Sequence, residues 1–180
     1  MAMDGPCLIG PAAALLVIDV QGRFAEIAFD AQGILSRLAS LIARARLSVP
    51  VVYTRQRFDD QIPPIQPLIR PASADTVIDK GSSDAFLDTG LDDWLAGRGI
   101  RTLVVTGFAT EACVDSTARS ALSHGCDLVL VSDCHTTTAD RGPDPVTARD
   151  VVAHYNATFQ KIHYGGRRIM VAPEHALRFE

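Results

Sequence analysis

Short apolar runs alternate with longer segments of helical spacing along most of the chain. Runs rich in apolar and β-branched residues predict strands at 13–18, 51–54, 76–79, 102–106, 127–132 and 161–163. Apolar residues that recur every three or four positions predict helices at 33–48, 87–98, 111–124 and 145–159, and a final helical turn is expected over 173–177. Residues 55–73 contain four prolines and are expected to form a long loop, a kind of segment that is often functional.

This alternation predicts the fold class. We expect an α/β protein with a doubly wound, Rossmann-like, mostly parallel six-stranded sheet and helices on both faces. A length of 180 residues suits a single domain over residues 1–180. Ligands of such sheets bind beyond the carboxyl ends of the strands, near the point where the strand order reverses. The residues that directly follow each strand are therefore the first candidates for a site.

Three chemically useful side chains follow strands. Asp19 comes after the first strand, Lys80 after the third, and Cys113 stands in the first turn of the helix after the fourth. The amino end of a helix stabilises a thiolate and offers N–H groups to an oxyanion, and a nearby Lys would lower the thiol pKa further. A carboxylate would accept the thiol proton. Taken singly, these residues have plainer explanations as a turn cap, a solvated Lys and a small buried apolar residue.

Composition and charge exclude several classes of function. The net charge is −4 and there is no dense basic run, which argues against a nucleic-acid partner. No apolar run reaches the roughly 18 residues that a bilayer span needs, and the first residues lack the pattern of a secretory signal, so we expect a cytoplasmic protein without a membrane partner. The four cysteines form no C-x-x-C pair, which argues against a zinc ribbon or a redox dithiol. Neither G-x-S-x-G nor G-x-G-x-x-G occurs.

Several longer stretches carry a resemblance to a known family. They are LLVIDVQ at 15–21, Lys80 with SDAF at 83–86, VVTGFATEACV at 104–114, and the residues from Thr117-Ala118 through Gly125 to VLVSD at 129–133. In this order, and over the span from Asp19 to Asn156, the chain resembles the isochorismatase-like cysteine hydrolases.

The resemblance implies a catalytic triad of Asp19, Lys80 and Cys113. It also implies a cis peptide between Phe108 and Ala109, with the backbone N–H groups of Ala109 and Cys113 forming an oxyanion hole. A small-molecule amide, ureido or related C–N bond would then be cleaved through a thioester, without a cofactor. Members of the family are usually dimers or larger, so a homo-oligomer is expected.

Two departures from family patterns narrow the substrate. Nicotinamidases of this family hold a metal with an Asp-x-His and a further His after the second strand, whereas residues 53–60 contain no His. We therefore predict no metal and disfavour nicotinamide. Isochorismatases proper cleave a vinyl ether and do not always need the cysteine, so the presence of Cys113 favours C–N hydrolysis. A vinyl-ether hydrolase and a non-catalytic binding or scaffold protein remain the alternatives.

Further residues near the strand ends are candidates for substrate binding. They are Gln21, Phe24, Phe86, Phe108, Glu111 and His135. Each has a structural alternative: core packing for the aromatic residues, a helix-terminus charge effect for Glu111, and a loop position satisfied by the backbone for His135. Arg55, Gln56 and Arg57 would suit an acidic substrate group or lie in solvent.

Overall fold

The computed structural model describes residues 6–143 and 145–180. Its strands are β1 (Cys7–Ile9), β2 (Ala13–Ile18), β3 (Val51–Gln56), β4 (Thr76–Lys80), β5 (Thr102–Phe108), β6 (Asp127–Thr136), β7 (His163–Tyr164), β8 (Arg167–Ala172) and β9 (Leu177–Phe179). Its α-helices are α1 (Phe24–Ile27), α2 (Ala31–Ala45), α3 (Leu91–Ala96), α4 (Asp115–Ser123) and α5 (Ala148–Phe159). Short 3₁₀ turns form at Pro67–Ile69 and Glu174–Ala176, and a π-helical turn at Thr110–Val114.

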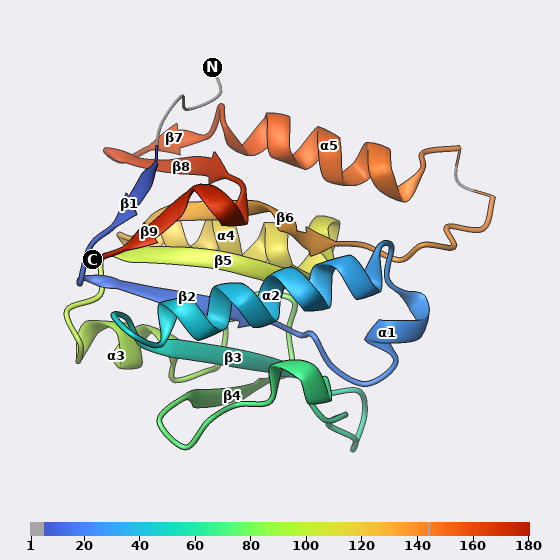
Figure 1. Ribbon diagram of the computed structural model, residues 1–180, viewed down its shortest axis with the longest axis horizontal. Helices are drawn as coiled ribbons and strands as arrows, with labels where there is room; N and C mark the ends of the chain where they lie inside the picture. Colours follow the sequence, from blue (N-terminus) through green and yellow to red (C-terminus); the bar gives the residue numbers. More distant parts are fainter. Residues whose placement is uncertain (1–5, 144) are drawn as a thin grey trace.

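The main sheet has the strand order β4-β3-β2-β5-β6-β8-β7 (Figure 1). The first six of these strands are parallel, which confirms the predicted doubly wound α/β fold, and only the two-residue β7 runs antiparallel, to β8. Chain order proceeds outward from β2 through β3 to β4, and then from β5 through β6 to β8. The switch point therefore lies between β2 and β5, where ligand sites of such sheets are found. A second, two-stranded sheet joins β1 to β9.

The last part of the sheet differs from the sequence prediction. The sixth parallel strand is β8, not residues 161–163, and β7 turns back onto it through Gly165 and Gly166, both at positive φ. Two arginines, the half-buried Arg167 and the exposed Arg168, open β8 and interrupt its apolar pattern, although Ile169 and Ala172 are buried. Strand β6 also continues beyond 132 to Thr136, because it pairs with β5 again after an irregularity in register.

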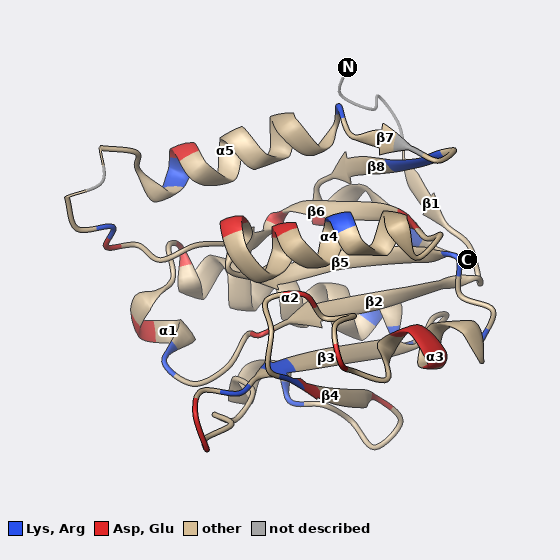
Figure 2. Cartoon of the chain, turned by 180° about the vertical axis from the view of Figure 1, so that it is seen from behind, with Lys and Arg blue, Asp and Glu red and all other residues tan. Residues whose placement is uncertain are grey.

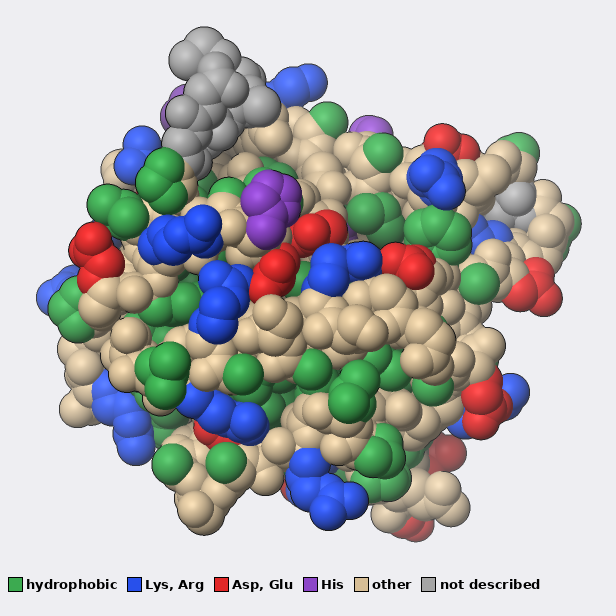
Figure 3. All heavy atoms as spheres, viewed as in Figure 1, with side chains coloured by type: hydrophobic (Ala, Val, Ile, Leu, Met, Phe, Trp, Pro, Cys, Tyr) green, Lys and Arg blue, Asp and Glu red, His purple; other side chains and the backbone are tan. Residues whose placement is uncertain are grey.

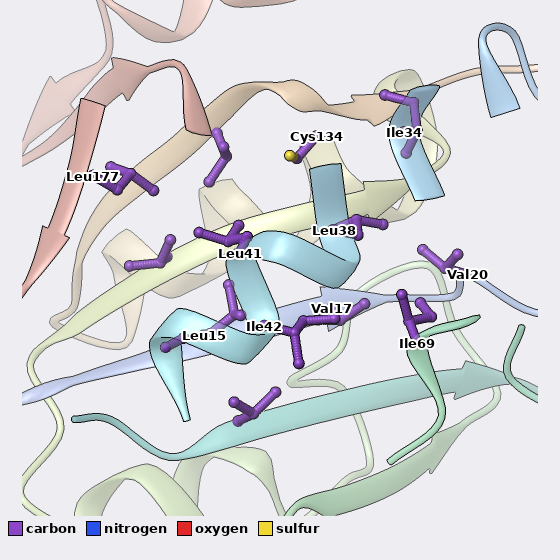
Figure 4. Close-up of a cluster of buried hydrophobic side chains, with 14 of the residues drawn as sticks. Leu15, Val17, Val20, Ile34, Leu38, Leu41, Ile42, Ile69, Cys134 and Leu177 are labelled. Atoms are coloured by element: carbon purple, nitrogen blue, oxygen red, sulfur yellow. The ribbon is translucent and has the colours of Figure 1, made fainter. Parts of the chain in front are cut away.

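Two apolar layers cover the sheet. On one face, helix α2 contributes buried residues at helical spacing that pack on β2 and β6, with Leu38 and Leu41 fully buried (Figure 4). On the other face, α3, α4 and α5 bury residues such as Leu95, Leu122 and Phe159 against the same strands. Full burial of one such side chain contributes about 1.5–3 kcal/mol. This arrangement confirms the prediction of helices on both faces.

Charge at the surface is mixed. Lys and Arg side chains lie among Asp and Glu side chains on the face that Figure 3 shows, and basic and acidic positions are interspersed along the chain seen from behind in Figure 2. Among the helices within residues 6–143 and 145–180, none has the length and apolar character needed to cross a membrane.

Candidate active site

Asp19 directly follows β2, a strand that is buried at every position. The residue is itself 5% exposed and adopts a left-handed backbone conformation with φ of 51°. This conformation costs a non-glycine residue about 1–2 kcal/mol, and Asp tolerates it better than most. Its carboxylate accepts a hydrogen bond from Thr54 Oγ1 at 2.7 Å and forms an ion pair with Lys80 Nζ at 2.7 Å. A buried carboxylate requires such partners, because an unpaired buried charge is strongly unfavourable.

Lys80 is the last residue of β4, and its side chain is fully buried. Besides the ion pair with Asp19, its ammonium group donates to Gln56 Oε1 at 2.7 Å and to the Ser82 carbonyl at 2.8 Å. The three protons of the Lys80 ammonium group therefore have three oxygen acceptors, one each on Asp19, Gln56 and Ser82. The same nitrogen lies 3.4 Å from Cys113 Sγ, so the ammonium group connects the carboxylate with the sulfur.

Cys113 lies in the π-helical turn that follows β5. Gly107 allows β5 to approach β2 closely at this point: its φ is 121°, and a Cβ there would lie 2.1 Å from the Ile18 carbonyl oxygen. Any other residue at 107 would push the two strands apart and move Cys113 away from Asp19. The peptide between Phe108 and Ala109 is cis.

The environment of Cys113 raises its thiol pKa. Burial is the largest cause, the negative charge of Asp19 adds to it, and the positive charge of Lys80 opposes both without cancelling them. The lowered thiol pKa that the lysine and the helix amino end had led us to expect is therefore wrong, because burial and Asp19 outweigh them. A protonated thiol beside a carboxylate is a nucleophile that reacts after it has transferred its proton to that carboxylate.

A cavity of about 560 Å³ opens at the carboxyl ends of β2 and β5. Its lining consists of Asp19, Gln21, Gly22, Arg23, Phe24, Ile27, Gln56, Phe58, Pro63, Ser83, Phe108, Ala109, Ala112 and Cys113. Three of the predicted substrate-binding residues, Gln21, Phe24 and Phe108, are among them. The structure thus brings the three predicted residues together at the switch point of the sheet, with Asp19 and Cys113 at the wall of the cavity and Lys80 buried behind them.

The other predicted substrate-binding residues do not line this cavity. Phe86 packs in the core on the sheet face that α3, α4 and α5 cover. Its ring stacks on that of His124, with the ring centroids 4.5 Å apart. Glu111 accepts hydrogen bonds from Thr137 and Arg141 at 2.6 and 2.7 Å. Burial raises the pKa of Glu111, but these hydrogen bonds outweigh it and lower the pKa overall.

His135 lies on β6 and not in a loop, because the strand pairs again with β5 and places His135 beside Gly107. Its two ring nitrogens contact Thr110 Oγ1 at 2.8 Å and Asn156 Oδ1 at 3.0 Å. Side chains, rather than the backbone expected from the sequence, therefore satisfy this histidine.

The polar residues after β3 also have roles that the sequence analysis missed. Arg55 forms a bidentate ion pair with Asp79, at 2.7 and 2.9 Å. Its guanidinium therefore binds a carboxylate of the protein itself and is not free for an acidic substrate group. Gln56 holds the ammonium group of Lys80. Thr54 is the last residue of the predicted strand 51–54, and this position at a strand end was its signal in the sequence. In the structure, parallel pairing places Thr54 opposite Ile18 and thus next to Asp19.

Metal ligands do not gather in the part of the chain that the structure describes. Within residues 6–143 and 145–180, no group of three or more His, Cys, Asp or Glu side chains is arranged to hold a metal ion.

The structure thus combines a doubly wound α/β fold with a buried cluster of Asp19, Lys80 and Cys113 at the switch point of the sheet. The model of the isochorismatase domain matches residues 13–162, and the chain belongs to the isochorismatase family of hydrolases.

Individual relatives agree with this assignment. A streptothricin hydrolase from Streptomyces noursei is 36% identical over 150 residues, which are 76% of this chain and 60% of that protein. A maleamate amidohydrolase from Pseudomonas putida KT2440 is 30% identical over 107 residues, which are 54% of this chain and 49% of that protein. The matches thus span about half to three fifths of these relatives. The crystal structure of an isochorismatase from Pseudomonas putida KT2440 superimposes with a TM-score of 0.82 at 26% identity, covering 96% of this chain and 93% of that one.

Proposed function

We propose that the protein is a cysteine-dependent amidohydrolase that cleaves a small amide, ureido or related C–N bond through a thioester. The observation that carries this proposal is the contact chain from Asp19 through Lys80 to Cys113, at 2.7 and 3.4 Å, beside a cavity that Asp19 and Cys113 both line. The relative named as a maleamate amidohydrolase supports the C–N bond as the target.

Acylation begins with a proton transfer. The Asp19 carboxylate takes the proton of the Cys113 thiol, whose raised pKa keeps it protonated until then. Lys80 stabilises the resulting thiolate, since its nitrogen lies 3.4 Å from the sulfur. The thiolate attacks the carbonyl carbon of the substrate, and the negative charge moves to the carbonyl oxygen. The backbone N–H groups of Ala109 and Cys113 are the proposed donors to this oxyanion.

Collapse of the tetrahedral intermediate breaks the C–N bond. The protonated Asp19 returns its proton to the leaving nitrogen, so that ammonia or an amine departs and the acyl group remains on sulfur. Water then attacks the thioester, again with Asp19 as the base. The carboxylic acid leaves, and the proton held by Asp19 returns to Cys113.

The test compares ammonia release by the wild type, Cys113→Ala and a control variant. The panel contains primary amides, N-carbamoyl compounds, biuret, ureidoacrylate-like acids and nicotinamide. We expect Cys113→Ala to lose at least about a thousandfold in kcat/KM. Cys126→Ala removes a buried thiol outside the cavity and should retain activity. Acid-quenched wild type should carry the acyl mass on the peptide that contains Cys113.

Other outcomes would support the alternatives. Turnover of isochorismate that survives in Cys113→Ala would favour a vinyl-ether hydrolase. A wild type that turns over no compound and binds none would favour a scaffold protein. The homo-oligomer remains a prediction, which light scattering of the purified protein tests directly.

A further inference from the structure

We propose that the substrate is uncharged and carries an aromatic or similarly bulky apolar group next to the scissile bond, and that amides bearing a carboxylate are poor substrates. This inference rests on the proposed function and names the substrate class of the same site. It follows from three features of the cavity: its aromatic wall, the pairing of its two amide side chains and its charge balance.

Three phenylalanines line the cavity. Phe24 and Phe108 meet edge to face, with ring centroids 5.5 Å apart, and they come from the opposite sides of the β2–β5 switch point. Phe58 lines the cavity from the loop after β3 and is 58% exposed. A tight turn holds it, because its N–H and carbonyl exchange hydrogen bonds with Gln61 at 2.8 and 2.9 Å. A large exposed aromatic residue at the wall of a cavity is typical of a surface that a ligand covers.

The amide side chains that line the cavity already have partners. Gln21 Oε1 accepts from the Gln56 backbone N–H at 2.7 Å, and its Nε2 donates to the Gln56 carbonyl at 2.9 Å. Gln56 Oε1 accepts from Lys80, and its Nε2 donates to the Arg57 carbonyl at 3.0 Å. These two glutamines therefore support the wall and are poorly placed to bind polar substituents of a substrate.

The charge balance of the cavity disfavours an anionic substrate. Arg23 is the one cation among the described lining residues; its side chain is 76% exposed at the rim of the cavity, where it forms a surface ion pair with Glu26 at 2.8 Å. The buried ammonium group of Lys80 is paired with Asp19. Phe58 itself is flanked by Arg57 on one side and by Asp59 and Asp60 on the other, and none of these three residues lines the cavity. A substrate carboxylate inside the cavity would lose its hydration without gaining a buried, unpaired cation from the described lining residues, whereas an aromatic ring would gain apolar and edge-to-face contacts.

A matched series of three primary amides tests this inference. 3-Phenylpropanamide, butanamide and succinamate differ only in the group at the far carbon, which is phenyl, methyl or carboxylate, and each releases ammonia. We expect kcat/KM for the phenyl compound to exceed that for butanamide about tenfold and that for succinamate at least about a hundredfold. Phe58→Ala should reduce the phenyl-to-methyl ratio to about two, and Phe58→Arg should raise kcat/KM for succinamate. Leu87→Ala, an exposed apolar residue outside the cavity, should leave all three ratios unchanged.

Calorimetric binding of the same three amides to Cys113→Ala separates this inference from the proposed function. Tighter binding of 3-phenylpropanamide than of succinamate supports the inference even if the wild type hydrolyses neither, an outcome that would count against the amidohydrolase alone. Succinamate that binds as tightly as the phenyl compound, or is hydrolysed as fast, overturns the inference and leaves the amidohydrolase intact.

Discussion

Two buried polar clusters flank the segment that carries Cys113, and they differ in almost every property. The charged cluster consists of Asp19, Thr54, Gln56, Lys80 and Cys113. The neutral cluster consists of Thr110, His135, Asn156 and the Ser132 carbonyl. The charged cluster opens into the cavity, whereas no side chain of the neutral cluster lines it.

The neutral cluster has a defined order of donors and acceptors. Asn156 Nδ2 donates to the Ser132 carbonyl at 3.0 Å, so its Oδ1 faces His135 and accepts from Nε2–H. The other ring nitrogen of His135 therefore accepts the hydroxyl proton of Thr110. Both ring nitrogens of His135 and both polar atoms of the Asn156 amide therefore have partners, and no side chain of this cluster lines the cavity. A buried histidine near the proposed nucleophile can thus act as a support, whereas the cluster that we propose to react has two side chains, Asp19 and Cys113, at the wall of the cavity.

The largest expected effect comes from breaking the ion pair of the charged cluster. Lys80→Met leaves the buried carboxylate of Asp19 without its cation and should lower the free energy of unfolding by about 3–5 kcal/mol. The double variant Asp19→Asn/Lys80→Met removes both charges and should recover most of this loss. Urea unfolding of the two variants measures the difference. A loss below about 1 kcal/mol for Lys80→Met would contradict the pairing.

The neutral cluster should respond in stability more than in activity. His135→Phe keeps the ring but leaves Thr110 and Asn156 without their partner, so unfolding should become easier by about 1–3 kcal/mol. The kcat/KM should fall less than tenfold. His124→Phe, at a partly exposed site stacked on Phe86, is the matched control and should change stability by less than about 0.5 kcal/mol. A loss of activity in His135→Phe at unchanged stability would instead make His135 catalytic.

The pH dependence of stability separates the clusters further. Burial lowers the pKa of His135, so the folded protein keeps the ring neutral at a pH where the unfolded chain binds a proton. Stability from this residue is therefore complete above the unfolded pKa near 6.5 and declines as the pH falls below it, by up to about 1.4 kcal/mol per pH unit. Unfolding of the wild type and His135→Phe at pH 7 and pH 5 measures it. If both proteins lose the same free energy of unfolding between pH 7 and pH 5, His135 does not contribute to the pH dependence of stability.

The smallest expected change is a shift in thiol reactivity. Because the charge of Asp19 raises the pKa of Cys113, Asp19→Asn should lower that pKa. Alkylation of Cys113 by iodoacetamide should then begin at a lower pH than in the wild type, although turnover is lost. Peptide mapping by mass spectrometry follows the site, with buried Cys126 as the internal control. A shift toward higher pH would contradict the assignment of Asp19 as the dominant charge beside the sulfur.

Much of the fold could be predicted because its signals are local. The apolar runs of β2 and β5 and the helical spacing of α2 identify elements within a few residues of their bounds. Strand β8 was missed because its opening arginines interrupt the apolar pattern. The position of His135 on β6 was missed because it depends on a register shift against β5, a contact between residues that are distant in the chain.

The sequence by itself determined the alternation of strands and helices, and with it the edge of the sheet where Asp19, Lys80 and Cys113 stand. Packing and register, by contrast, set three features: Gln56 holds Lys80, Phe86 and Glu111 do not line the cavity, and the thiol pKa rises. The reason is the separation along the chain of the residues that interact. Periodicity and strand ends are properties of neighbouring residues, whereas a pKa or a hydrogen bond depends on distances that packing and register set.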